Sequence, residues 1–129
     1  MSSFTTPLIV ETMPDGKNWK LYRKFRYHVK TKFSRTIISV PRNFVTDFAS
    51  IPRFLFFLPD WATYSKAPVL HDWLYLRKVT TRKEADDLFL EAMLVDWRHH
   101  KSRHIIAYIE YYAVRLFGWL MWNKKRGRK

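Results

Sequence analysis

A three-residue link between two helical patterns constrains the fold of this chain more than any other feature. The first pattern begins near Ser65, carries Pro68 in its first turn, where proline is tolerated, and continues to about Lys78. The link is Val79-Thr80-Thr81. A link this short makes the next helix fold back along the first, so the sequence predicts an antiparallel helical hairpin.

The second helix of this hairpin begins with a capping box. Thr81 and Glu84 stand three residues apart, so the threonine hydroxyl accepts from the Glu84 amide while the glutamate carboxylate reaches back to the Thr81 amide. The helical pattern continues to about Trp97, and residues 98–101 form a basic, histidine-rich loop.

A third helix is predicted over residues 103–122, with Ser102 as its cap. It is apolar or aromatic over most of its length, but Glu110 and Arg115 interrupt it. A membrane-spanning helix avoids such charges, so we expect a core helix packed against a sheet or the hairpin. The alternative is an interfacial helix, because aromatic residues followed by the basic tail 124–129 suit an anionic bilayer surface.

The residues before the helices are typical of β-structure. Leu8-Ile9-Val10 is a short apolar run. Residues 19–29 alternate between large apolar and basic side chains for much of their length, which predicts a half-exposed second strand, and Thr36-Ile37-Ile38-Ser39-Val40 is a third strand. Residues 41–62 are predicted to be a loop. The predicted fold class is therefore α+β: a small N-terminal antiparallel sheet followed by an antiparallel helical hairpin and a long C-terminal helix.

Length and residue usage set the broad class of the protein. A chain of 129 residues predicts a single domain, 1–129, and 47% hydrophobic residues are enough for a core. The absence of cysteine favours a reducing compartment or a virion. The start Met1-Ser2-Ser3-Phe4 lacks the basic and apolar pattern of a signal peptide.

The charge of the chain points to anionic partners. Lysine and arginine number 24 against 11 acidic residues, and the net charge is +13. Such a surplus predicts attraction to nucleic acid, to an anionic membrane surface or to an acidic partner, and does not choose among them. The candidate binding residues form the tail: Lys124, Lys125, Arg126, Arg128 and Lys129.

A polar constellation lies in the first helix of the hairpin. At 100° per residue, the apolar side chains of this helix form one arc, and His71, Asp72 and Tyr75 fall on the opposite arc. His71 and Tyr75 are one turn apart, so the imidazole and the phenol lie on the same side of the helix.

Asp86 of the second helix departs from the pattern of its neighbours. It stands four and seven residues before Leu90 and Met93, within the apolar arc, whereas Asp87 lies on the polar side. An ionised carboxylate there is costly unless it is paired, and the hairpin brings His71 close. We infer a buried His71–Asp86 contact. It fits either a catalytic or metal site or a satisfied polar pair of the core, and acids are favoured in a first helical turn in any case.

Motifs spread over most of the chain resemble an uncharacterised family of small phage-encoded domains of unknown function. They are Val45-Thr46-Asp47-Phe48-Ala49-Ser50-Ile51-Pro52, His71-Asp72-Trp73-Leu74-Tyr75, Arg82, Ala85-Asp86, Phe89, Met93, Tyr112-Ala113-Val114-Arg115 and Gly118. The resemblance implies a bacteriophage or prophage source. The expected location is the host cytoplasm or the virion, or peripheral at the membrane, and phage virion proteins are candidate partners. It carries no established activity.

The hairpin has a second, narrower resemblance. It is similar to the active-site hairpin of the phospholipase A2 superfamily, bacterial and parvoviral branches included, in its pattern His-Asp-x-x-Tyr followed by Ala-Asp-x-x-Phe. The resemblance implies that His71 is the general base for a water attacking the sn-2 ester and that Asp72 binds Ca²⁺. Tyr75 and Asp86 would orient the histidine, and Asp47 could supply a further oxygen.

The chain departs from the phospholipase pattern in two ways. The glycine-rich calcium loop is missing, since the chain has only 3 glycines, and so are the cysteines that brace most members. A weaker metal candidate is formed by His99, His100 and His104, for which a solvated basic loop is the simpler interpretation.

Two functions follow as hypotheses. The first is a metal-dependent lipid or ester hydrolase acting at an anionic membrane. The second is a non-enzymatic phage virion or accessory protein that binds nucleic acid, a membrane surface or virion partners, with a purely structural hairpin.

Overall fold

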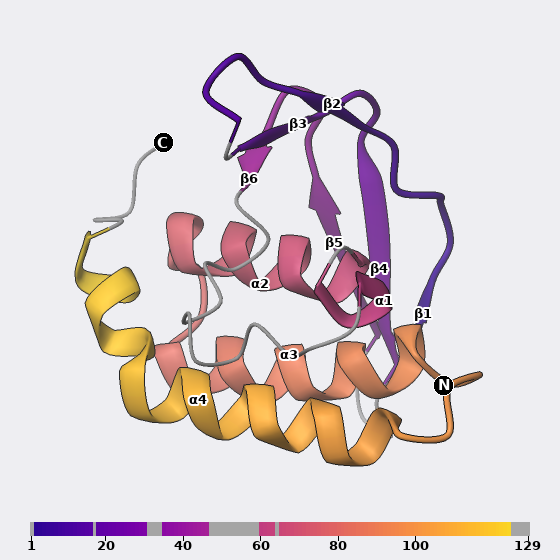
Figure 1. Ribbon diagram of the computed structural model, residues 1–129, viewed down its shortest axis with the longest axis vertical. Helices are drawn as coiled ribbons and strands as arrows, with labels where there is room; N and C mark the ends of the chain where they lie inside the picture. The colour runs from indigo at the N-terminus through magenta and orange to yellow at the C-terminus, as the bar shows by residue number, and fades with distance from the viewer. Residues whose placement is uncertain (1, 17, 31–34, 47–59, 64, 125–129) are drawn as a thin grey trace.

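The fold is described from a computed structural model that defines residues 2–16, 18–30, 35–46, 60–63 and 65–124 (Figure 1). Two small antiparallel sheets precede three long helices, so the predicted α+β class is confirmed. In place of the one sheet expected, the strands divide into two sheets of three strands each.

The first sheet follows the predicted alternation of apolar and basic residues. It contains β1 (Ser3–Phe4), β4 (Phe25–Lys30) and β5 (Arg35–Val40) in the order β1-β4-β5, with both pairs antiparallel. The apolar side chains of β4 are buried, whereas Arg26 and Lys30 between and after them are exposed. One face of this sheet therefore packs on the core and the other carries basic residues.

The second sheet holds β2 (Val10–Thr12), β3 (Trp19–Leu21) and β6 (Val45–Thr46), in the order β2-β3-β6. The prediction of one continuous strand over residues 19–29 is therefore wrong. Apolar residues keep the same alternation on both sides of the break at residues 22–24, so the pattern alone does not reveal it.

Backbone hydrogen bonds explain why the chain breaks at this point. The Leu21 amide donates to the carbonyl of Phe44 at 2.9 Å, and the Asn43 amide donates to the Leu21 carbonyl at 2.9 Å. These contacts hold the end of β3 against the segment that follows β5. The next strand, β4, then joins the other sheet. The residues that bond Leu21 lie too far along the chain for local periodicity to reveal this break.

The helices are α1 (Asp60–Thr63), α2 (Lys66–Arg77), α3 (Arg82–Asp96) and α4 (Arg103–Lys124). The predicted hairpin is present as α2 and α3, and α4 extends two residues beyond its predicted end. Residues 41–62 were expected to form a loop, but β6 lies within them and α1 begins within them. Figure 1 shows α3 between α2 and α4, with α4 outermost and farthest from the sheets.

The predicted capping box starts α3. The Thr81 hydroxyl accepts from the Glu84 amide at 3.1 Å, and the Thr81 amide donates to the Glu84 carboxylate at 3.0 Å. Just before it, Lys78 ends α2 in the left-handed conformation, with φ of 53°. These two local features fix the short turn of the hairpin.

The start of α2 is capped from a distance. Ser65 is the N-cap residue, but its side chain makes no capping hydrogen bond. The carboxylate of Asp96, at the end of α3, accepts from the amides of Lys66 and Ala67 at 2.9 and 3.2 Å. An acceptor at a helix N-terminus satisfies amides that have no partner within the helix. The hairpin is thus joined at its open end as well as at its turn.

Helix α2 is buried on most of its surface. The apolar residues Val69, Leu70 and Leu74 face the core, as expected. The opposite arc, with His71, Asp72 and Tyr75, is buried too, and His71 and Tyr75 both contact Asp86 of α3. Among the described residues, no helix combines the length and apolar character needed to cross a bilayer.

Candidate functional site: a buried histidine–aspartate network

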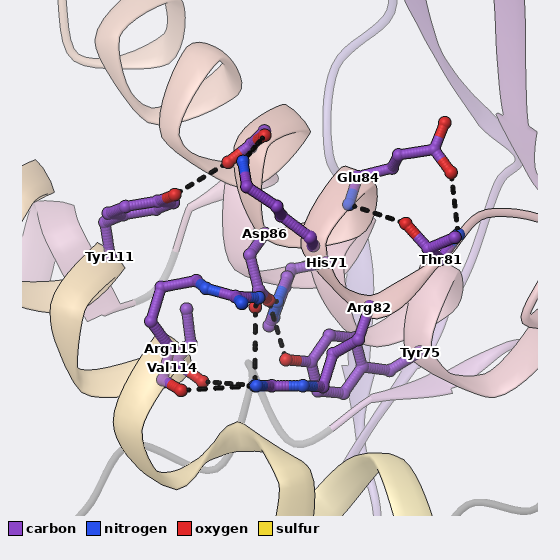
Figure 2. A network of polar contacts seen from close by, with 11 residues as sticks. His71, Tyr75, Thr81, Arg82, Glu84, Asp86, Tyr111, Val114 and Arg115 are labelled. Atoms are coloured by element: carbon purple, nitrogen blue, oxygen red, sulfur yellow. Dashed lines mark hydrogen bonds and ion pairs between the residues drawn. The ribbon is translucent and has the colours of Figure 1, made fainter.

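Asp86 is the centre of a polar network between the three long helices (Figure 2). Its side chain is fully buried, and its Oδ1 lies 2.7 Å from Nε2 of His71. The Tyr75 hydroxyl donates to the same oxygen at 2.6 Å. The contact inferred between His71 and Asp86 is therefore present, and the phenol one turn along α2 joins it.

The second carboxylate oxygen faces two arginines. Nη1 of Arg115, on α4, donates to Asp86 Oδ2 at 2.7 Å, and Nη1 of Arg82 lies 3.5 Å from that oxygen. Arg82 also donates to the backbone carbonyls of Val114 and Arg115 at 3.0 and 3.3 Å. These contacts bind α4 to the hairpin at the level of the network, as Figure 2 shows.

The network keeps Asp86 ionised. Burial alone raises the pKa of this carboxyl, but hydrogen bonds from His71, Tyr75 and Arg115 outweigh burial, and the net pKa lies below the ordinary value. For Tyr75 both effects act together: burial and the neighbouring Asp86 carboxylate raise the pKa of the phenol. The phenol therefore remains a hydrogen-bond donor at neutral pH.

An ionised Asp86 decides which nitrogen of His71 carries the proton. A carboxylate only accepts hydrogen bonds, so Nε2 is the donor in this pair. In a neutral imidazole the lone pair then lies on Nδ1, which is the nitrogen able to take a proton. The orientation thus presents a base, provided that water reaches the ring.

Aromatic side chains hold the imidazole in place. The ring of Phe89 stacks on that of His71 with centroids 4.3 Å apart, and the Tyr75 ring packs at 4.1 Å. His71 is only 3% exposed. Gly118 of α4 in turn lies against the Tyr75 hydroxyl, because a side chain at this position would overlap it. Packing and hydrogen bonds together leave the ring one orientation.

Of the two expected metal ligands, one lies within the described residues. Asp72 follows His71 on α2 and is 3% exposed. Asp47, the other expected metal ligand, lies outside the described residues. No group of three or more His, Asp or Glu side chains in the described part of the chain could hold a metal ion. Asp72 matches a calcium ligand in kind, since Ca²⁺ binds oxygen ligands.

The remaining sequence candidates lie elsewhere. His100 stacks on Trp61 with centroids 4.0 Å apart, and His99 and His104 are exposed. In the basic tail, Lys124 ends α4, and residues 125–129 lie outside the described residues. The structure therefore brings His71, Tyr75 and Asp86 together and leaves the binding role of the tail a prediction.

The arginines of the network were not predicted as partners of Asp86. Arg115 interrupts an apolar helical pattern, and a charge in such a position needs a buried counterion. This signal could have linked Arg115 to Asp86, since both depart from the pattern of their helix. Glu110 interrupts the same helix and is 3% exposed, yet neither of its carboxylate oxygens has a hydrogen-bond partner among the described residues.

Comparison with known proteins places this network within a family. No curated protein and no solved structure matches the chain significantly. Residues 19–114 match DUF1353, described as a protein of unknown function. The match begins at β3 and includes the whole hairpin and most of the network. Because it covers most of the 129 residues, the chain belongs to the DUF1353 family.

Proposed function

We propose that this protein is a bacteriophage-encoded lipid or ester hydrolase in which His71 acts as the general base. One observation carries the proposal: Nε2 of His71 and the Tyr75 hydroxyl meet the same oxygen of the buried Asp86, at 2.7 and 2.6 Å. The phospholipase A2 superfamily, which the hairpin resembles, orients its catalytic histidine with the same residue types. If the source is a phage, phage genes should flank this gene.

The chemistry follows from the orientation of the imidazole. Nδ1 of His71 takes a proton from a water molecule as the water oxygen attacks the ester carbonyl carbon. The tetrahedral intermediate then collapses, the carbon–oxygen bond to the leaving alcohol breaks, and the proton passes from Nδ1 to that alcohol. The products are a fatty acid and an alcohol. Asp86 stabilises the imidazolium that exists between the two proton transfers.

Calcium belongs to the proposal through Asp72. A bound Ca²⁺ would polarise the ester carbonyl, and Asp72 would be one of its ligands. Asp47 is a second candidate ligand on the sequence pattern alone. The base chemistry of His71 is proposed without a step at the ion, and calcium dependence is tested separately.

A second candidate function has its own support. Asp86 binds Arg115 and lies near Arg82, so the network also joins three helices. Such a buried, fully paired carboxylate can be purely structural. The protein would then be a non-enzymatic phage virion or accessory component. Its net charge of +13 would attract nucleic acid or virion partners. Binding to duplex DNA that weakens steeply with salt would support this function.

The test is release of fatty acid from vesicles of equal parts phosphatidylglycerol and phosphatidylcholine, measured by mass spectrometry. His71→Gln keeps an amide donor for Asp86 but cannot take a proton from water, so the rate should fall at least about 100-fold. The exposed His104 provides the matched control, and His104→Ala should keep the wild-type rate. Circular dichroism and thermal unfolding establish that each variant is folded.

The possible results test the role of His71 as the base separately from the role of a bound calcium ion. Wild-type protein no faster than buffer, or His71→Gln as fast as wild type, would remove the hydrolase proposal. A wild-type rate that EGTA abolishes and Ca²⁺ restores would support the role of Asp72. A rate equal in EGTA and in Ca²⁺ would remove calcium and leave His71 as the base.

A further inference from the structure

The outward side of α4 is an uncovered apolar surface. Six large apolar residues there are between 43% and 68% exposed: Ile105, Tyr108, Tyr112, Leu116, Trp119 and Leu120. Most of them are spaced three or four residues apart, so they line one side of the helix. We call these six residues the α4 outer face. None of the exposed residues between 105 and 123 is charged.

The opposite side of α4 accounts for the normal packing of this helix. Ala107 and Gly118 are buried there, and α3 packs against this side. Arg115, the one basic residue in the middle of the helix, is held by Asp86. Figure 1 shows α4 as the outermost helix, with no other described element covering its outer side. The helix is therefore apolar both towards the core and towards solvent, which is unusual for a surface helix.

The outer face is long enough to rest on a partner surface. Residues 105–120 span about 22 Å at 1.5 Å per residue. Three of its six members are tyrosine or tryptophan, whose rings combine an apolar body with a polar edge. Such residues concentrate at the boundary between lipid tails and water. A helix with this composition, lying flat with the apolar side inward, is the pattern of an interfacial membrane helix.

Charge selects between lipid and a second copy of the chain. The net charge is +13, and exposed basic residues precede α4 at Arg98 and Lys101. In the sequence, residues 124–129 add five more basic side chains directly after the outer face. Two copies joined through α4 would bring these like charges together, whereas a layer of anionic headgroups would attract them.

We propose that the α4 outer face docks on an anionic lipid bilayer, with its aromatic rings at headgroup depth and the basic residues at both ends near lipid phosphates. The binding stands on the exposed face and the charge, and does not rest on hydrolysis by His71. If the proposed hydrolysis holds as well, docking brings the enzyme to a lipid substrate.

The experiment is flotation of the full chain with two kinds of vesicle. One contains equal parts phosphatidylglycerol and phosphatidylcholine, and the other contains phosphatidylcholine alone. The test variant carries Leu116→Ser and Trp119→Ser. The matched control carries Ile37→Ser and Val79→Ser, because these residues are 56% and 71% exposed but lie outside α4. All the substituted side chains are exposed, so circular dichroism should show wild-type folding.

The expected result is binding of wild type to the anionic vesicles and much weaker binding to the neutral ones. The test variant should bind anionic vesicles at least about tenfold more weakly, since two large apolar side chains no longer reach the lipid. The control variant should bind as wild type does. Removal of residues 125–129 should weaken binding to anionic vesicles only, by several-fold for the charges lost.

Three results would overturn the proposal. The first is equal flotation of the test variant and wild type. The second is a wild-type dimer in sedimentation without lipid that the Leu116→Ser and Trp119→Ser variant converts to monomer, which would assign the face to a second copy. The third is a wild type that binds duplex DNA and floats with neither vesicle. His71→Gln should float as wild type does, so a loss of hydrolysis alone leaves the docking proposal standing.

Discussion

Gly118 on α4 lies directly against the hydroxyl of Tyr75 on α2, and a Cβ at position 118 would overlap that oxygen. Glycine in the middle of a helix is unfavourable by about 1 kcal/mol relative to alanine. Its presence here is explained by the close approach of the two helices, which lets the phenol reach Asp86.

Gly118→Ala should therefore destabilise the protein in spite of the better helix propensity of alanine. The expected loss is roughly 1 to 3 kcal/mol in the free energy of unfolding, measured in urea, because the phenol must move. The control is the same change in a Tyr75→Phe background, where the overlapping oxygen is absent. The penalty should shrink there, and an undiminished penalty would show that Gly118 matters for another reason.

Asp86 and Asp87 are neighbours with very different environments. Asp86 is fully buried and paired, whereas Asp87 has a side chain that is 46% exposed and accepts from Lys83 and Tyr111. Asp86→Asn should cost about 3 to 5 kcal/mol, since it leaves buried donors without a charged partner. Asp87→Asn should cost less than about 1 kcal/mol. Equal losses in urea unfolding would contradict the assignment of Asp86 as the centre of the network.

Asp86 should also contribute to the loss of stability at acid pH. Its pKa is lowered in the folded state, so its stabilising effect is present above the unfolded value of 3.8 and is lost as the pH falls through the folded value. Arg115→Met removes one cause of the lowering. The variant should lose stability at a higher pH than wild type in urea titrations between acid and neutral pH. If wild type and Arg115→Met lost stability over the same acid pH range, Arg115 would not lower the pKa of this carboxyl.

The cap of α2 offers a local test of the hairpin. Asp96, rather than the N-cap residue Ser65, accepts from the first amides of this helix. Asp96→Ala should cost roughly 0.5 to 2 kcal/mol, with increased amide hydrogen exchange at Lys66 and Ala67. Asp87→Asn is a matched exposed control that should leave these amides protected. Unchanged exchange in Asp96→Ala would assign the cap to another group.

The hairpin was predictable because its signals are local. The capping box of Thr81 and Glu84 and the departure of Asp86 from its apolar arc both lie within one helix. The division of residues 19–29 into two strands was not predictable, since the contacts that hold Leu21 at the end of β3 come from Asn43 and Phe44, far along the chain. The role of Arg115 lies between these cases: its anomaly was visible in the sequence, but the position of α4 against Asp86 depends on tertiary packing.

Glu110 is the second charged residue that interrupts the apolar pattern of α4. The residue is 3% exposed, and neither carboxylate oxygen has a hydrogen-bond partner in the part of the chain that the structure describes. Burial raises the pKa of this group from 4.5 to about 8. At neutral pH the folded protein therefore holds a protonated Glu110, whereas the unfolded chain releases that proton.

The sign of the resulting pH dependence follows from proton binding. Between 4.5 and about 8 the folded state binds more protons at Glu110 than the unfolded state, so this residue makes stability fall as the pH rises. Glu110→Gln removes the titration. The variant should match wild type at about pH 4.5 and exceed it by several kcal/mol at pH 8, on a scale of about 1.4 kcal/mol per pH unit. The exposed Glu11 supplies the control, since Glu11→Gln should follow wild type throughout. A constant difference between Glu110→Gln and wild type across this range would show that Glu110 does not titrate on unfolding.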